Sequence, residues 1–520
     1  MVLTGKSSKP NLFERTIAFF SPHTGLKRMA AREATRAYDS AQNSNTSDWT
    51  SANYTSANSE IRYALRLLRN RARDVVRNTP FAKKALHTIV NNTVGAGIMA
   101  NIKSPDLRQQ KNVQALWHKW AETTLCDYNG EQNFYALQAL AMTAVVESGE
   151  VVARVRSGKG KISLQMLECD YLDQYKDLAD GCVQGVKLDE NDQIIGFWLF
   201  EKHPGDYSAT GIVNLIPAEQ VIYVRRIERP NQVHGVTWFH SVLETINSYN
   251  DLQAVTLVRQ KVAACYSAFI TSPENDTNTL VNQTTLTAQR QQDSALEPGM
   301  IRYLRNGEKM ELAKPPASEG YADFSKITLR AIAAGLGITY ESLSGDFSNV
   351  NFSSGRMGAL EFQRNIEVWR WHMLIPQFCE PAFEAFSKWC AIQGVDTDGC
   401  IVEWVPPART MIDPAAETKA ISEQLRLGLT TLPRAIAEMG YDYAETIAEI
   451  KQSNADLDDA KIILDGDPRK VTQQGIAQLS DPTQIGAITA KALEPSPAPA
   501  SGAASPAPSA KPNPKSPKKA

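Results

Sequence analysis

The segment Gly158-Lys159-Gly160-Lys161 combines the two residue types that bind phosphate in nucleotide-binding loops. The complete pattern of Gly, four residues, Gly-Lys and Ser or Thr is absent, however. The flanking segments Val151–Arg156 and Ile162–Leu167 alternate apolar and polar residues, as strands do. We therefore predict a β-hairpin whose turn contains both glycines, and we expect no nucleotide site there.

Histidines and cysteines are the other residues that could form a reactive or metal-binding centre, and there are seven of each. They form no His-Glu-x-x-His, His-x-His or Cys-x-x-Cys spacing, and no Gly-x-Ser-x-Gly elbow is present. An odd number of scattered cysteines is typical of reduced thiols. We expect no enzyme, no cofactor and no metal, because a hydrolase built from distant residues has no support in these spacings.

One row of arginines has a regular helical spacing. Apolar residues recur at steps of three and four through Glu60–Arg77, which predicts an amphipathic helix. The arginines of its other face are Arg62, Arg66, Arg69, Arg73 and Arg77. Two interpretations stay open: a solvated or ion-paired face, or a contact with nucleic acid or a neighbouring subunit.

Composition narrows the class of protein. The 520 residues contain 42% apolar residues, enough for about three domains with sizeable cores. Lys and Arg number 55 against 57 Asp and Glu, so the chain lacks the basic excess of a protein that grips DNA over its whole surface. No apolar run approaches the roughly 20 residues that span a bilayer, and the N-terminus is a poor signal peptide. We expect no membrane association.

The first half of the chain predicts an α+β region. Helical periodicity is followed by short strands with period two, the pattern of helices packed with an antiparallel sheet. The expected helices are 60–77, 80–91, 107–126 and 131–148, and the expected strands are 151–156, 162–167, 183–188, 194–200 and 221–224. Before them, the Ser/Thr/Asn-rich residues 40–59 are a solvated linker or an arm that is processed or wraps a partner.

The middle of the chain predicts two rods separated by a polar insert. A long helix is expected over Phe239–Phe269 and another over Tyr321–Leu336. The insert, residues 271–300, is dominated by Thr, Asn, Gln and Ser, and a short hairpin-like piece follows over 300–304 and 309–312.

The last third begins with a polar loop, Gly345–Ser354, that leads into a long aromatic helix, Ser354–Phe378. Pro376 and Pro381 are expected to kink or segment that helix. A strand over 402–405 and helices over 415–427, 432–439 and 443–452 follow. From Pro495 the chain is rich in Pro, Ala and Ser and is expected to be disordered.

Five segments, taken together and in order, resemble the lambda-type portal proteins of tailed bacteriophages. The resemblance covers roughly residues 15–450, and each motif alone is weak. The five are Phe20-Ser21-Pro22 with Arg28, Arg32 and Tyr38; Arg69–Asp74 with Arg77–Pro80 and Gly95-Ala96-Gly97; Glu147-Ser148-Gly149-Glu150; Leu336-Gly337-Ile338 through Ser348–Ser354 with Arg364, Trp369 and Pro376; and Asp413-Pro414-Ala415 with Gly428-Leu429-Thr430 and Met439–Asp442.

The resemblance implies a dodecameric ring at one capsid vertex, through which double-stranded DNA is packaged and ejected without sequence specificity. It also implies docking of the terminase large subunit, contacts with the major capsid and scaffold proteins, and attachment of head-tail completion proteins. The expected location is the virion, with assembly in the host cytoplasm.

The family fold has a wing, a two-helix stem, a clip inserted in the stem and a helical crown, which agrees with the pattern of rod, insert and rod. The expected divisions are a flexible arm 1–60, wing 61–239, first stem helix 240–270, clip 271–318, second stem helix 319–338, tunnel loop, aromatic helix and remaining wing 339–410, crown 411–470, and a disordered tail 471–520.

The polar loop lies where the family has its tunnel loop, between the second stem helix and the aromatic helix. By this resemblance its residues face DNA: Asp346, Asn349, Val350, Asn351, Phe352, Ser353 and Ser354. The loop lacks Lys and Arg, which suits a passage because cationic contacts would hold a moving polyanion. The alternative is a loop that only packs between subunits.

Two rival functions stay open at this point. One is another phage structural component, such as a neck or scaffold protein, although the length and the two rods argue against it. The other is a nucleic-acid-processing hydrolase, which a test of metal dependence would detect.

Overall fold

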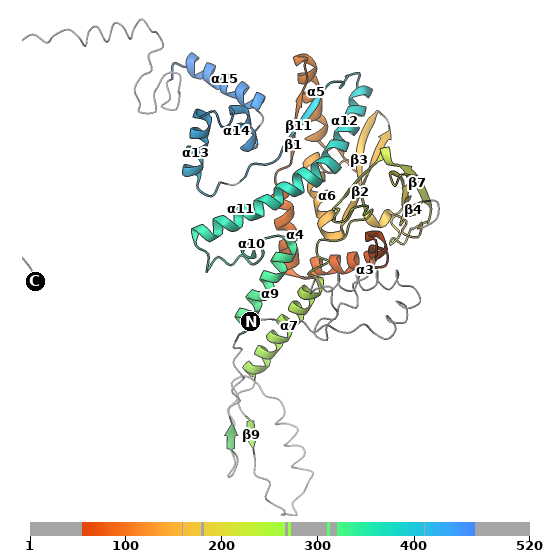
Figure 1. The fold of residues 1–520 in the computed structure, drawn as a ribbon, viewed down its shortest axis with the longest axis vertical. Helices are drawn as coiled ribbons and strands as arrows, with labels where there is room; N and C mark the ends of the chain where they lie inside the picture. Colours follow the sequence, from red (N-terminus) through yellow and green to blue (C-terminus); the bar gives the residue numbers. More distant parts are fainter. Residues whose placement is uncertain are drawn as a thin grey trace, which may run out of the picture. The chain divides into compact units, whose positions relative to one another are not determined.

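The computed structural model describes residues 55–158, 160–177, 181–265, 269–271, 309–311, 320–409, 411–441 and 443–462. The chain forms two compact units, residues 1–440 and 441–520, and the division falls inside the range predicted as the crown. Figure 1 shows the first unit as helices gathered around short sheets, so the α+β class is confirmed.

Helices of the first unit begin with α3 and α4, which are separated by Thr79 alone. The extended backbone of Thr79 ends α3, and Pro80 occupies the first turn of α4, where its missing N–H has no cost. The helices are α3 Ala57–Asn78, α4 Pro80–Thr93, α5 Leu107–Ala121, α6 Phe134–Ser148, α7 Leu243–Cys265, α9 Tyr321–Leu336, α10 Tyr340–Ser344, α11 Phe352–Trp369, α12 Glu380–Ile392, α13 Pro414–Arg426 and α14 Leu432–Glu438. In the second unit α15 spans Tyr443–Asp459.

The strands form antiparallel sheets. They are β1 Met99–Lys103, β2 Glu150–Gly158, β3 Lys161–Glu168, β4 Cys182–Val183, β5 Val186–Leu188, β6 Ile194–Phe200, β7 Val213–Pro217, β8 Val221–Arg225, β9 Phe269–Thr271, β10 Lys309–Glu311 and β11 Ile401–Val405. One sheet has the order β3-β2-β8, another has the order β4-β5-β6-β7, and β1 pairs with β11 and β9 with β10. Short 3₁₀ turns lie at Thr124–Cys126, Cys169–Tyr171 and Ala218–Gln220.

The main core is built around tryptophan and phenylalanine. Trp117 and Trp120 of α5 are fully buried and contact Phe134 of α6 and Phe386 of α12. A second, smaller core lies between the β3-β2-β8 and β4-β5-β6-β7 sheets and includes Val152, Leu167 and Leu199. These two cores hold the three-stranded sheet from both faces.

The two predicted rods are α7 and α9, which contact each other. Gly335 of α9 makes this close approach possible, since a Cβ at that position would lie 2.4 Å from Cγ1 of Val242. Apart from Thr271, the 271–300 insert lies outside the described residues. Of the predicted hairpin-like piece, 300–304 also lies outside them, and the described partner of Lys309–Glu311 is Phe269–Thr271.

The expected single strand 183–188 is wrong: these residues form the hairpin β4–β5. Val183 pairs with Val186, so Gln184 and Gly185 are the two turn residues. Both have positive φ, 45° and 91°, as the tightest hairpin turns require. The predicted hairpin β2–β3 is confirmed, with Gly158 opposite Lys161.

The aromatic helix differs from the expected Ser354–Phe378. After α11 the chain continues as a π-helix, Arg370–Cys379, and then as α12 without a break. Pro376 has no N–H to donate, and the N–H of Glu380 bonds the carbonyl of Ile375 five residues back. The wider helical turn accommodates Pro376 inside a continuous helix, while Pro381 lies in the first turn of α12.

Candidate functional site

Of the predicted tunnel-loop residues, Asp346, Asn349, Val350 and Asn351 lie between α10 and α11. Phe352, Ser353 and Ser354 are the first three residues of α11, so the helix begins earlier than the expected Ser354. The side chain of Asp346 accepts bonds from the backbone and hydroxyl of Ser348 and from the Tyr340 hydroxyl, which is 3.1 Å away. These bonds, the Ser348 hydroxyl first, lower the pKa of Asp346. The carboxylate is therefore charged and closes the loop's own turn.

Asn351 and Ser354 are occupied in starting α11. The Asn351 side chain accepts the Ser354 N–H at 2.8 Å, and the Ser354 hydroxyl accepts the Asn351 N–H at 3.2 Å. This reciprocal pair is a capping box, which satisfies two backbone donors at a helix start. Both residues are exposed, but their side chains have a structural task.

The apolar loop residues flank a cavity of about 580 Å³. Phe347 and Val350 line it, together with Phe362 of α11 and Met411 beyond β11. Asn349, Phe352 and Ser353 do not line it. They are exposed, and the side chains of Asn349 and Ser353 make no hydrogen bond within the described residues. Of the predicted set, these three are the residues best placed for contact with something outside the chain.

The arginine row of α3 is mostly ion-paired. Arg62 bonds Asp177 at 2.7 Å, Arg73 bonds Asp170 at 2.5 Å, and the buried Arg69 pairs with Glu150. The ion-paired interpretation therefore holds for these three residues, and none of their guanidinium groups is available to nucleic acid. The sequence did not indicate the acidic partners, which come from distant segments.

Glu150 is the centre of a buried polar cluster. Its carboxylate accepts bonds from Arg69, from the Tyr223 hydroxyl and, at 2.8 Å, from the Gly235 N–H, and His234 Nδ1 lies 3.1 Å from it. Burial alone would raise the pKa of Glu150, but His234, Arg69 and these hydrogen bonds outweigh it and hold the pKa at about 2. The cluster joins α3, β2, β8 and the 232–237 loop.

This cluster explains the segment Glu147-Ser148-Gly149-Glu150. The Ser148 carbonyl accepts from Arg69 and its hydroxyl from Arg73. Gly149 has φ 94°, and a Cβ there would lie 2.5 Å from the Val236 carbonyl carbon. The motif is structural: it locks α3 and the 232–237 loop onto the start of β2.

Low pH is expected to destabilise the Glu150 cluster. Because the pKa of Glu150 is lowered from 4.5 to about 2, its contribution to stability is complete above pH 4.5 and is lost as the pH falls towards 2. Circular dichroism of the chain between pH 5 and 2 should show unfolding in that window. Glu60→Gln is the control: the Thr55 hydroxyl and Arg229 lower the pKa of Glu60 too, but this ion pair is exposed, so its loss should move the acid transition only slightly.

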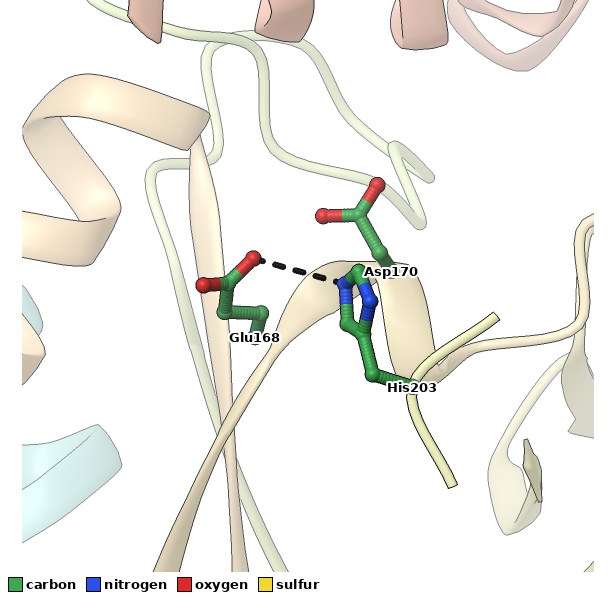
Figure 2. A group of neighbouring side chains, drawn as sticks. All are labelled: Glu168, Asp170 and His203. Carbon is green, nitrogen blue, oxygen red and sulfur yellow. Dashed lines mark ion pairs between the residues drawn. The ribbon is translucent and has the colours of Figure 1, made fainter. Parts of the chain in front are cut away.

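Glu168, Asp170 and His203 form the one group among the described residues whose ligand atoms are close enough to hold a metal ion. Figure 2 shows Glu168 and His203 turned toward each other, with 3.6 Å between Nε2 and Oε2. Arg73 Nη2 lies 3.2 Å from Glu168 and 2.5 Å from Asp170, so a guanidinium already forms an ion pair with each carboxylate. A divalent cation would have to displace it, and we assign no metal here.

The polar clusters around Glu150 and Arg73 hold the fold together, and the polar segment at the start of α11 is exposed. No helix in these ranges is long and apolar enough to cross a membrane.

A family model described as phage portal protein, lambda family, matches residues 41–370, well over half of the chain. The chain therefore belongs to the lambda family of phage portal proteins. It is a structural phage protein that serves DNA packaging, and not an enzyme. Portal proteins form oligomeric rings in the phage head and join it to the neck or tail.

Similar curated proteins are named as portal proteins. The probable portal protein of Halomonas phage phiHAP-1 is 24% identical over 441 residues, covering 79% of this chain and 81% of the relative. Portal protein B of Escherichia phage lambda is 24% identical over 444 residues, covering 73% and 81%. Among solved structures, a chain from the neck of an empty gene transfer agent particle is 13% identical with a TM-score of 0.45, covering 71% of this chain and 93% of that one.

Proposed function

We propose that twelve copies of this chain form a ring at one capsid vertex, whose central channel passes double-stranded DNA during packaging and ejection. Membership of the portal family is the observation that carries this proposal. The ring is also the docking platform for the terminase large subunit and later for head-tail completion proteins. It contacts the major capsid and scaffold proteins during assembly in the host cytoplasm.

The domain divisions follow the family plan. The wing corresponds to 61–239 with part of 339–410, and the stem to α7 and α9, which lie within the predicted ranges 240–270 and 319–338. The clip, 271–318, docks terminase and lies almost entirely outside the described residues. The crown corresponds to 411–470, where α13, α14 and α15 are found. The arm 1–60 lies mostly outside the described residues, and the tail 471–520 lies wholly outside them.

Exposed apolar side chains on both stem helices support assembly into a ring. Val255, Leu257 and Val258 of α7 are more than half exposed, as are Phe324 and Ile327 of α9. Large exposed apolar patches mark protein–protein contacts. Neighbouring copies of the same two helices would cover these side chains.

The loop before α11 is the proposed contact with moving DNA. It contains no Lys or Arg from Gly345 to Ser354, and Asp346 adds a negative charge. Each phosphate that a cation neutralises adds affinity, so a neutral or weakly acidic lining avoids deep binding positions along the path. Asn349, Phe352 and Ser353 are the proposed contact residues.

Electron microscopy of the purified chain, with mass measurement of the same sample, tests the ring. We expect rings with a central hole and a mass of about a dozen chains of 57.3 kDa. Val258→Asp with Ile327→Asp should reduce the yield of rings, because it places charge on the apolar stem faces. Arg108→Gln, on exposed α5 surface, should not. A stable monomer or dimer in all salt conditions would contradict the proposal.

A further inference from the structure

A cavity of about 250 Å³ lies between the β3-β2-β8 and β4-β5-β6-β7 sheets. Strands β2 and β3 contribute Arg154, Arg156, Gln165 and Leu167 to its lining. The other sheet contributes Leu199 and Phe200 of β6 and Asn214 of β7, and Tyr171 and Glu201 complete the lining. None of the features described above uses this cavity.

Strand periodicity places the two arginines there. Val152, Arg154 and Arg156 alternate along β2 and so share one face of the sheet. Val152 pairs with Leu167, and both belong to the apolar core between the sheets. Two residues further along, Arg154 pairs with Gln165. The same face therefore changes from apolar to cationic where the cavity lies.

Neither arginine is neutralised by a carboxylate. Arg156 donates from Nε to Gln165 Oε1 at 2.7 Å, and its guanidinium lies 5.5 Å from the centre of the Tyr128 ring. Arg154 makes no hydrogen bond or ion pair within the described residues, and its Nε is buried without a partner. Glu201 is the one acidic residue of the lining, but it is exposed and forms no ion pair with either arginine.

This arrangement is unfavourable for an empty site. Burial, and then the charge of Arg156, lower the pKa of Arg154. Buried donors without partners and like charges side by side both destabilise a fold. The arginines of α3 differ from Arg154 and Arg156 in this respect, since Arg62, Arg69 and Arg73 all have carboxylate partners. Two arginines without a carboxylate partner in one cavity are an arrangement that can bind an oxyanion.

We propose that Arg154 and Arg156 form a binding site for one small oxyanion of the phosphate class. A guanidinium presents parallel N–H donors that match the oxygens of such an anion, and two of them balance a dianion. Gln165, Asn214 and Tyr171 line the same cavity and carry further hydrogen-bond donors. The cavity suits a single small anion, and a duplex is far larger.

Calorimetric titration of the full-length protein, as it purifies, with inorganic phosphate tests the proposal. The reference titration uses chloride at the same ionic strength. We expect one phosphate per chain, and binding about tenfold or more weaker in Arg154→Gln and in Arg156→Gln, since each removes a charged hydrogen-bonding group. Arg108→Gln is the matched surface control and should bind phosphate as the wild type does. Glu201→Gln removes a repelling carboxylate and should bind at least as tightly.

Thermal unfolding separates ligand binding from a structural role. Without phosphate, Arg154→Gln should unfold at the same temperature as the wild type or a higher one, because a poorly solvated charge is removed. With phosphate, the wild type should gain stability and the variant should not. Equal phosphate binding by wild type and both variants, or a response that chloride reproduces, would overturn the site. Competition by duplex DNA with no binding of free phosphate would also overturn it.

Discussion

Replacing Glu150 by glutamine is expected to destabilise the protein by about 3–5 kcal/mol, the range for breaking a buried ion pair by removing one partner. Arg69 is only 1% exposed, so its charge would remain buried without the carboxylate that balances it. The free energy of unfolding from urea denaturation, followed by circular dichroism at neutral pH, measures the change.

Two further variants test whether the destabilisation comes from the buried charge of Arg69. Arg69→Met combined with Glu150→Gln removes both charges, while the glutamine carbonyl oxygen remains available as an acceptor for the buried donors around it. This pair should be less destabilising than Glu150→Gln alone, because no unbalanced charge stays buried. Glu60→Gln removes a carboxylate from an exposed pair with Arg229 and should change stability much less than Glu150→Gln, because solvent screens exposed pairs. A loss below 1 kcal/mol in Glu150→Gln would mean that the cluster does not hold the fold.

Local periodicity was sufficient for most helices and for the β2–β3 hairpin. The expected helix Tyr321–Leu336 matches α9 at both ends, and β6 matches Ile194–Phe200. In these elements, apolar spacing and end signals such as glycine at position 337 agree with the final packing.

Elements that depend on distant partners were missed. Strand β1 has only five residues and pairs with β11, about three hundred positions later, as in Ala100 opposite Trp404. Strand β7 is mostly exposed and ends in Pro217, so it lacks the buried alternation by which strands are recognised. The carboxylate partners of the α3 arginines could not be predicted, because they come from distant segments of the chain. Arg69 and Glu150, for example, lie 81 positions apart.

In the candidate site, the sequence contained one signal that was overlooked, and one feature could not be predicted from it. Asn351 is a favoured N-cap residue, and the sequence alone could have placed it at the start of α11, whereas the Ser354 hydroxyl completes the capping box without the usual Glu or Gln. That Phe347 and Val350 line a cavity could not be predicted, because the cavity includes residues as distant as Asn91 and Met411. Asn349, Phe352 and Ser353 are exposed and line no cavity, so we keep them as the proposed contact residues, and contact of the loop with DNA stays a prediction.

Replacing Asn349 and Ser353 together by lysine is expected to reduce the number of DNA-filled heads about tenfold or more. Each lysine would neutralise phosphates of the passing duplex, and the ring would repeat it in every subunit. Quantifying packaged DNA in heads assembled with the variant, and packaging rate with purified components, measures the effect. Asn351→Lys is a poor test, because loss of the N-cap alone costs about 0.5–2 kcal/mol of helix stability.

A neutral pair of substitutions separates charge from shape. Asn349→Gln with Ser353→Asn changes side-chain size at the same two positions and should package normally. Because phosphate contacts weaken as salt rises, higher ionic strength should partly restore packaging by the lysine variant and leave the neutral variant unaffected. Unchanged packaged length and rate in the lysine variant would place the loop away from DNA and favour a loop that only packs between subunits. Electron microscopy of the variant ring must first show normal assembly, so that a packaging defect reports on passage of DNA.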